Sequence, residues 1–114
     1  MTPDAAAFAR DWVDSFNGRD LDRILAHYAD DVRLTSAIAK RVTGSAEVNG
    51  KAALGAYFAT ALARRPDLKF DMRRVYVGVD SIVIEYDALD GKVASEFMQF
   101  NPDGLVQRVA AHYA

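Results

Sequence analysis

The sequence predicts an α+β domain, in which helices from the first half of the chain pack on one face of a curved, mostly antiparallel sheet from the second half. Two observations carry this prediction. Apolar residues recur at helical spacing before residue 66, whereas the chain from residue 68 onward contains four segments rich in β-branched and aromatic residues. The length of 114 residues, with 51% hydrophobic content, predicts a single domain over residues 1–114.

The first helix is predicted over residues 3–16. Its apolar face is Phe8, Trp12 and Phe16, which recur every four residues. The "NGRD" turn at 17–20 ends the helix, because an Asn-Gly pair tolerates positive φ.

A short second helix is expected after Asp20, whose side chain suits the capping position. Its inward stripe consists of Leu21, Ile24, Leu25 and Tyr28. Asp30 and Asp31 follow, ahead of a segment that reads as a strand. We interpret this pair as the end of the helix, where short polar side chains bond nearby backbone amides, and not as an acid–base site.

A third helix is predicted between Asn49, which suits the cap, and Pro66, which stops it. One face of this helix carries Leu54, Tyr57, Phe58, Ala61 and Leu62. The basic run "ARR" at 63–65 fits the carboxyl end of the helix, where the helix dipole favours cations.

The second half of the chain is expected to form a meander of strands. Its segments are "LKFDMRRVYVGV", "SIVIEYDAL", "KVASEFMQF" and "GLVQRVAAHYA". They are separated by "DS", "DG" and "NPDG", which are turn signals, and Asp-Gly in particular suits the two positive φ values of a tight hairpin. Consecutive strands joined by tight turns pair in an antiparallel way.

Composition excludes several classes of function. Fourteen basic and sixteen acidic side chains give a formal net charge of -2, so no nucleic-acid partner is expected. The absence of cysteine excludes disulfides and thiolate metal sites. His27 and His112 lack acids at ligand spacing, so we expect solvent or interface positions for both, no metal and no other cofactor. No segment resembles a secretory signal or a membrane span, which predicts a soluble, cytoplasmic protein with no membrane partner.

Three quoted stretches carry a resemblance to a known superfamily. They are "FARDWVDSFNGRDLDRILAHYADDVRL", "NGKAALGAYFATAL" and "FNPDGLVQRVAAHYA". In their order along the chain they resemble the nuclear transport factor 2-like superfamily, and more closely its SnoaL-like and ketosteroid-isomerase-like branch. The resemblance implies a cone-shaped fold of three N-terminal helices packed on a strongly curved sheet, with an apolar pocket at the open end. Members include isomerases, cyclases, dehydratases, epoxide hydrolases and proteins with no known reaction.

The resemblance also matches individual positions. Ser36 falls where the steroid isomerases carry the carboxylate that moves the proton, and serine cannot act as that base. Trp12 matches their hydrogen-bonding tyrosine, and its indole can donate a hydrogen bond without comparable acidity. Glu96 takes the position of an acid that those enzymes hold on a later strand.

Strand alternation supports a catalytic role for Glu96. Glu96, Met98 and Phe100 share one face of "SEFMQF", and the two apolar neighbours indicate that this face points inward. A carboxyl group among apolar side chains has a raised pKa and can exchange a proton near neutrality. The alternative is a bulge that turns Phe97 inward and leaves Glu96 in water.

An apolar cavity is predicted beside Glu96. Several tyrosines lie on the faces expected to point inward, and a buried hydroxyl needs a polar partner. The residues predicted to bind substrate are Trp12, Phe16, Tyr28, Ser36, Tyr57, Phe58, Tyr86, Met98, Phe100 and Tyr113. Such a cavity favours neutral or weakly acidic apolar compounds over nucleotides or sugars. The alternative is that these side chains fill the core completely.

Three functions remain open at this stage. The first is an isomerase, cyclase or dehydratase that uses Glu96 for proton transfer on an apolar substrate. The second is a pocket that binds an apolar ligand without turning it over, and the third is a dimerisation module whose cavity is vestigial. A homodimer is expected in each case, from the resemblance and from the outward residues Arg108, Ala110 and His112, whose small and polar side chains suit contact between sheets.

Overall fold

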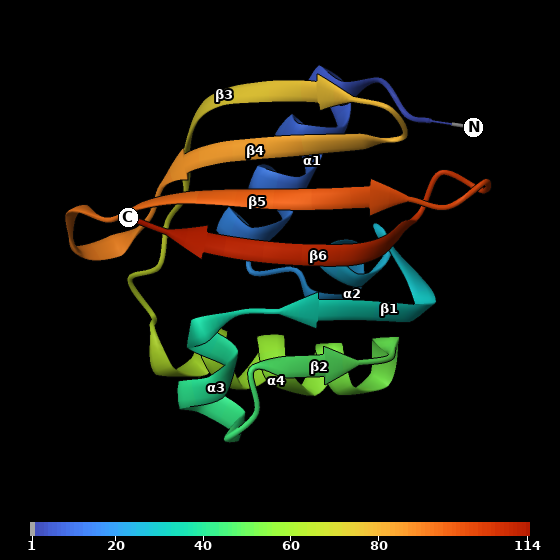
Figure 1. Ribbon diagram of the computed structural model, residues 1–114. Helices are drawn as coiled ribbons and strands as arrows, with labels where there is room; N and C mark the ends of the chain where they lie inside the picture. The colour runs from blue at the N-terminus through green and yellow to red at the C-terminus, as the bar shows by residue number, and fades with distance from the viewer. Residues whose placement is uncertain (1) are drawn as a thin grey trace.

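The structure is a computed structural model that describes residues 2–114, at position 89 for the backbone alone. Within these residues, four α-helices pack on one face of a six-stranded sheet (Figure 1). The helices are α1 (Ala5–Asn17), α2 (Leu21–Leu25), α3 (Ala37–Thr43) and α4 (Lys51–Arg64). The strands are β1 (Tyr28–Thr35), β2 (Glu47–Asn49), β3 (Asp71–Gly78), β4 (Ser81–Asp87), β5 (Val93–Phe100) and β6 (Val106–Tyr113). A short 3₁₀ turn, η1 (Leu89–Gly91), joins β4 to β5.

The sheet is open and mixed, with strand order β2-β1-β6-β5-β4-β3. The strands from β3 to β6 form the antiparallel meander that the turn signals predict. The sheet is mixed because β1 pairs parallel to β6 and antiparallel to β2. Figure 1 shows α1 crossing behind the meander and α4 behind β1 and β2, so one face of the sheet is covered and the other is bare.

The α+β class predicted from the sequence is confirmed. Asp20 caps α2 as predicted, since its side chain accepts a hydrogen bond from the backbone N–H of Arg23 at 3.2 Å. The Asp-Gly turn also has the predicted geometry, with φ of 62° at Asp90 and 70° at Gly91. In the "NGRD" turn, by contrast, the positive φ falls on Arg19, at 55°, and not on the glycine.

The interpretation of Asp30 and Asp31 as a helix end was wrong. Both residues lie in β1, and both are exposed. The pairing of β1 with β6 shifts register between Tyr28 and Arg33, and two consecutive exposed side chains are typical of such a bulge. Tyr28 therefore belongs to the strand and not to the helical stripe of α2.

The number of helices and one cap also differ from the prediction. Ser36 ends β1 and caps α3, a helix that was not predicted, by accepting hydrogen bonds from the N–H groups of Ile38 and Ala39 at 3.1 and 3.4 Å. Asn49 is paired with Arg33 in the β1–β2 ladder, so Gly50, with φ of 87°, takes the cap of α4 instead. None of the helices in residues 2–114 has the length and apolar character needed to cross a membrane.

Candidate functional site

A cavity of about 320 Å³ lies between the helices and one end of the meander. Its size falls at the lower end of the range for small-molecule pockets. The apolar part of its wall consists of Phe16, Ile38, Val42, Phe58, Ala61, Leu62, Leu68, Phe70 and Ala88. Polar groups also line it, namely Tyr57, Tyr86, Glu96 and Tyr113, together with the charged residues Arg41, Arg64, Arg65, Asp90 and Lys92.

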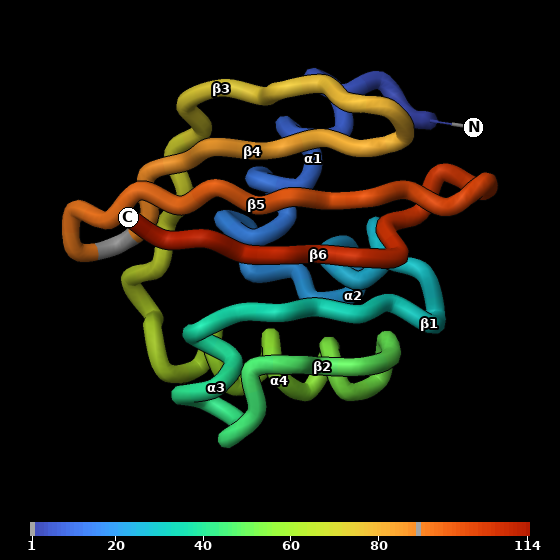
Figure 2. Tube along the Cα trace, in the orientation of Figure 1, coloured from blue at the N-terminus to red at the C-terminus, as the bar shows by residue number. Residues whose placement is uncertain are grey.

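The connection from α4 to β3 supplies one wall of this cavity. Figure 2 shows it climbing from the end of α4 to β3 on the same side of the molecule as η1. Asn17, at the end of α1, holds the connection in place, because its amide donates to the carbonyl of Phe70 at 2.9 Å and accepts from the N–H of Phe70 at 2.8 Å. The aromatic ring of Phe70 is thereby fixed in the cavity wall.

Glu96 projects into the cavity from β5. Its neighbours across the sheet are Ile84 on β4 and Ala111 on β6, and only 8% of the residue is exposed. The alternative of a bulge at Phe97 is excluded, because the register shift in β5 falls between Gln99 and Phe100. The inward orientation predicted from strand alternation is therefore confirmed.

Burial raises the pKa of Glu96 from 4.5 to about 7. A hydrogen bond from the Tyr86 hydroxyl to Oε1, 2.6 Å long, and the charge of His112 both oppose this rise. Within residues 2–114, Oε2 accepts no hydrogen bond, so this oxygen is free for a ligand. Glu96 thus combines a carboxyl group that is partly ionised at neutral pH with one oxygen held and one available.

Three tyrosines share the cavity wall with this carboxyl group. Burial raises the pKa of Tyr57 to about 12, and it holds the pKa values of Tyr86 and Tyr113 well above the usual range. The negative charge of Glu96 adds to each of these shifts. All three phenols are consequently neutral at physiological pH and can donate a hydrogen bond.

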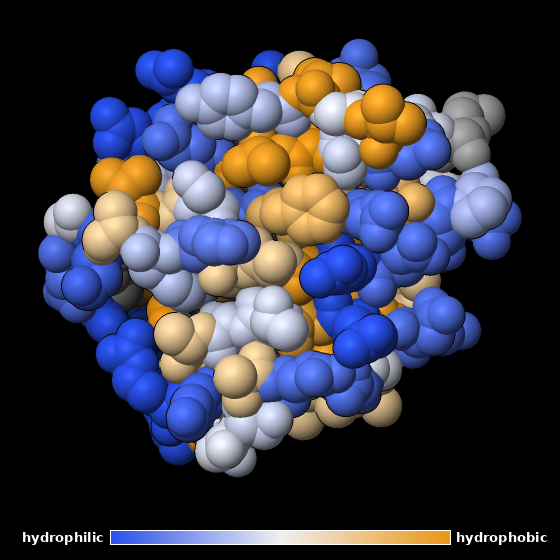
Figure 3. All heavy atoms as spheres, in the orientation of Figure 1, coloured by the Kyte–Doolittle hydropathy of each residue, from blue (hydrophilic) through white to orange (hydrophobic). Residues whose placement is uncertain are grey.

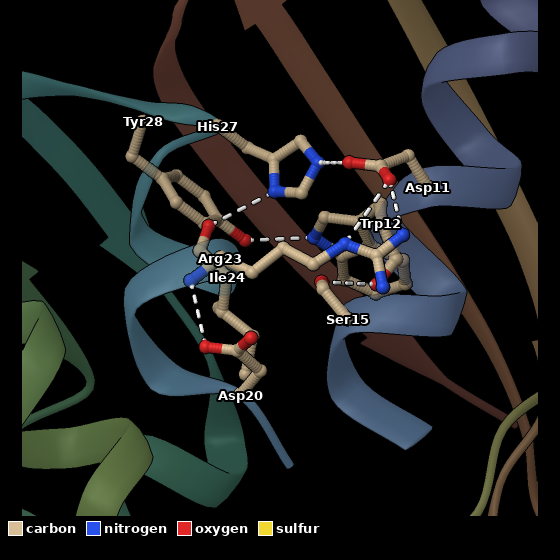
Figure 4. A network of polar contacts seen from close by, with 8 residues as sticks. All are labelled: Asp11, Trp12, Ser15, Asp20, Arg23, Ile24, His27 and Tyr28. Atoms are coloured by element: carbon tan, nitrogen blue, oxygen red, sulfur yellow. Dashed lines mark hydrogen bonds and ion pairs between the residues drawn. The ribbon is translucent and has the colours of Figure 1, made fainter. Parts of the chain in front are cut away.

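A second polar cluster ties α1, α2 and β1 together (Figure 4). His27 contacts a carboxylate oxygen of Asp11 through Nε2 at 2.7 Å and the carbonyl of Ile24 through Nδ1 at 3.0 Å. The other Asp11 oxygen pairs with Arg23, and the hydrogen bond from Arg23 lowers the pKa of Asp11. His27 is buried and paired, contrary to the expectation of a solvent or interface position, whereas His112 is exposed as expected.

The cluster in Figure 4 contains two of the residues predicted to bind substrate. Trp12 donates from Nε1 to the hydroxyl of Tyr28 at 2.8 Å, and both side chains are fully buried. Trp12 stacks on Phe70, with the ring centroids 5.7 Å apart, so it lies one layer behind the cavity wall. The structure therefore places Trp12 and Tyr28 in the core.

Six of the eleven predicted site residues meet at the cavity. They are Glu96, Phe16, Tyr57, Phe58, Tyr86 and Tyr113. The other five lie outside its wall: Trp12, Tyr28, Ser36, Met98 and Phe100. Phe100 packs edge-on against Phe8, and Met98 is completely buried. Ser36 caps α3, and its hydroxyl lies 3.3 Å from that of Tyr113, so it contacts the site through another residue.

Sequence reasoning missed the contribution of α3 and the charged residues of the cavity. Ile38, Arg41 and Val42 line it from α3, and the four-residue spacing of the two apolar side chains was the available signal. The sequence predicts only a basic helix end at Arg64 and Arg65, whereas both residues line the cavity. In the part of the chain that the structure describes, no three His, Cys, Asp or Glu side chains are grouped to hold a metal ion.

Comparisons with known proteins agree with this architecture. The sequence model of the SnoaL-like domain matches residues 9–113. A SnoaL-like protein of unknown function from Burkholderia thailandensis is 41% identical, with a TM-score of 0.91 over 96% of this chain and 94% of that one. A candidate ketosteroid isomerase from Kribbella flavida is 25% identical, with a TM-score of 0.75 over 95% of this chain and 76% of that one.

A solved structure with lower sequence identity supports the fold alone. A candidate polyketide cyclase from Sinorhizobium meliloti is 13% identical, with a TM-score of 0.79 over 93% of this chain and 94% of that one. No curated protein matches the chain.

Proposed function

The chain belongs to the SnoaL-like domain family, and from this premise we propose that it is a proton-transfer enzyme acting on a small apolar substrate. Glu96 is the proposed catalytic residue. The observation that carries the proposal is the position of Glu96, a buried carboxyl group with a pKa of about 7 and a free oxygen facing an apolar cavity. A group with this pKa can both accept and return a proton at neutral pH.

The reaction class follows from what such a carboxyl group can do. Oε2 accepts a proton from a carbon atom next to a substrate carbonyl, and the Tyr86 hydroxyl fixes the carboxyl group through Oε1. Return of the proton to a different carbon gives an isomerisation. Transfer of the proton to a hydroxyl group on the neighbouring carbon, which then leaves as water while a C=C bond forms, gives a dehydration. The likeness to a candidate ketosteroid isomerase supports this class of chemistry. The residues proposed to contact the apolar substrate are Phe16, Tyr57, Phe58, Tyr86 and Tyr113.

Deuterium incorporation tests the proposed reaction directly. We expect the wild-type protein in deuterium oxide to exchange the acidic C–H hydrogens of apolar cyclic ketones, such as tetralone, faster than buffer alone. The rate should rise with pH and level off above about 7, because the ionised form of Glu96 is the base. Proton NMR follows the loss of signal. A protein that binds the ketones but exchanges them no faster than buffer would be a binding module and not an enzyme.

The bare face of the sheet supports the proposal of a homodimer. Tyr76, Val83, Phe97 and Ala110 lie directly opposite one another on β3 to β6 and form an apolar row across this face. Polar rows flank it, with Arg74, Glu85, Ser95 and His112 on one side and Ser81, Gln99 and Arg108 on the other. Figure 3 shows apolar side chains gathered over β3, β4 and β5 and bordered by hydrophilic ones. A second copy can match this pattern by two-fold symmetry.

Light scattering over a dilution series tests the dimer. We expect twice the mass of one chain at micromolar concentration and a monomer for Phe97→Asp, because a charge in the apolar row would be buried without a partner. Val79→Asp is the matched control, since Val79 is 90% exposed at the β3–β4 turn, outside the row. A wild-type protein that is monomeric at this concentration, or equal dissociation by both variants, would contradict the proposal.

A further inference from the structure

Positive charge gathers around a cavity whose wall also carries nine apolar side chains. Four cations line it, Arg41, Arg64, Arg65 and Lys92, against two acids, Asp90 and Glu96. This excess contrasts with the whole chain, whose formal net charge is -2. A cleft with one sign of charge attracts ligands of the opposite sign.

The four cations are not equivalent. Arg65 pairs with Asp90 at 3.2 Å and with Asp67 at 3.7 Å, so its charge is neutralised within the protein. The side chains of Arg41, Arg64 and Lys92 have no hydrogen bond or ion pair with any other residue in the range 2–114. Their charges are therefore available to a ligand.

Arg41 shares the cavity wall with two tyrosines, Tyr57, which is buried, and Tyr113, which is partly buried. It is in the last turn of α3. Burial and the charge of Glu96 raise the pKa values of Tyr57 and Tyr113, and the positive charge of Arg41 opposes this rise with a smaller effect. All three side chains face the same cavity, and the charge of Arg41 is not neutralised by an acid in residues 2–114. Ser36 links the start of α3 to the Tyr113 hydroxyl, which fixes this helix relative to β6.

We propose that Arg41, Tyr57 and Tyr113 form an anion-binding subsite, and that the ligand is an apolar ring compound that carries an anionic oxygen group. The ring would lie against Phe58 and Phe70, and the anionic oxygen would face the guanidinium and the two phenols. This inference rests on the proposed function, because it specifies the substrate of the reaction assigned to Glu96.

The chemistry of the three side chains suits an oxygen anion. A guanidinium supplies charge-assisted hydrogen bonds, and the neutral phenols add donors without adding charge. The same set would stabilise a carboxylate of the substrate or an enolate that forms when Glu96 removes a proton. A phosphorylated nucleotide or a sugar lacks the apolar ring surface that most of the wall requires.

Equilibrium binding of a matched pair of probes tests the subsite. Naphthoate carries a carboxylate and naphthamide is its neutral counterpart of nearly equal shape. We expect the wild-type protein to bind naphthoate about tenfold more tightly at low salt, with the preference shrinking as salt is added. Arg41→Gln should weaken naphthoate binding about tenfold and leave naphthamide unchanged, and Tyr57→Phe should give a smaller loss of the same kind. Calorimetry or NMR titration measures each dissociation constant.

Arg10→Gln is the control for the loss of one positive charge. Arg10 is exposed on α1 and is not part of the cavity wall, so this variant should bind both probes as the wild type does. Equal affinity for the two probes, no binding of naphthoate, or an equal loss in Arg10→Gln and Arg41→Gln would overturn the subsite. Failure of the proposed function is separate, because it appears as absent deuterium exchange while the preference for naphthoate persists.

Discussion

Glu96→Gln is expected to lower the rate of deuterium exchange by a factor of about 10² to 10⁴ while stabilising the folded protein at alkaline pH. Glutamine keeps the shape of the side chain and still accepts the hydrogen bond from Tyr86. It cannot accept or return the proton, because an amide does not ionise in this range. Loss of function with a gain in stability distinguishes a buried functional carboxyl group from a residue that merely supports the fold.

The gain in stability has a defined pH dependence. The pKa of Glu96 is raised on folding from 4.5 to about 7, so the folded state binds the proton more tightly than the unfolded state. The contribution of Glu96 to the stability of the folded protein is therefore fully present below pH 4.5, is lost as the pH rises through about 7 and is absent above it. A shift of this size corresponds to about 3 kcal/mol in order of magnitude.

Denaturant unfolding at several pH values measures this effect. We expect Glu96→Gln and the wild type to be similar near pH 4.5, and the variant to be more stable at pH 8 by about 1–3 kcal/mol. The gain in the free energy of unfolding should be smaller than the full effect of the pKa shift, because the glutamine amide adds two hydrogen-bond donors that need partners. Glu47→Gln is the control, since Glu47 is exposed on β2 and pairs with Arg33. A stability difference for Glu96→Gln that does not change with pH would mean that Glu96 titrates as it does in the unfolded chain.

The inward position of Glu96 could be predicted because alternation is a local property of a strand. Met98 and Phe100 fix which face of β5 is apolar, and Glu96 shares that face. Its hydrogen-bond partner could not be predicted in the same way. The contact with Tyr86 depends on the register between β4 and β5, which the turn at η1 sets, and a shift of one residue would turn Tyr86 to the opposite face.

The α3 helix is absent from the elements that the sequence predicts. It spans seven residues, which is too short for a clear periodic pattern, and it ends at Gly44 in the left-handed conformation. By resemblance Ser36 matches a catalytic position, whereas its local role is to cap this helix. Without this helix, Arg41 lies outside every predicted element, so the sequence predicts no face for its side chain.

Trp12 shows the limit of periodicity in the first helix. Spacing of four residues correctly places Trp12 on the buried face of α1, beside Phe8 and Phe16. Periodicity predicts which side chains are buried, but it does not predict which of them line the cavity. Phe16 borders the cavity and Trp12 does not, because Phe70 lies between the indole and the cavity.

The core position of Trp12 leads to a prediction that separates stability from binding. Trp12→Phe removes part of a ring that contacts Phe16, Phe70 and Tyr86, and it leaves the buried Tyr28 hydroxyl without its donor. We expect a loss of about 2–4 kcal/mol in the free energy of unfolding. Tyr28→Phe keeps the ring and removes only the hydroxyl, so the unpaired indole N–H should cost about 1–3 kcal/mol.

The double variant Trp12→Phe/Tyr28→Phe decides whether the hydrogen bond in Figure 4 is the cause. It removes the donor and the acceptor together and leaves no buried polar group unpaired, so its loss should be smaller than the sum of the single losses by about 1 kcal/mol or more. Tyr76→Phe is the control, because Tyr76 is 47% exposed and its hydroxyl can reach water. The dissociation constant of naphthoate should stay the same in all stably folded variants, since neither residue lines the cavity. Additive losses in the free energy of unfolding would mean that Trp12 and Tyr28 contribute independently. Weakened binding of naphthoate would mean that both residues are part of the functional site.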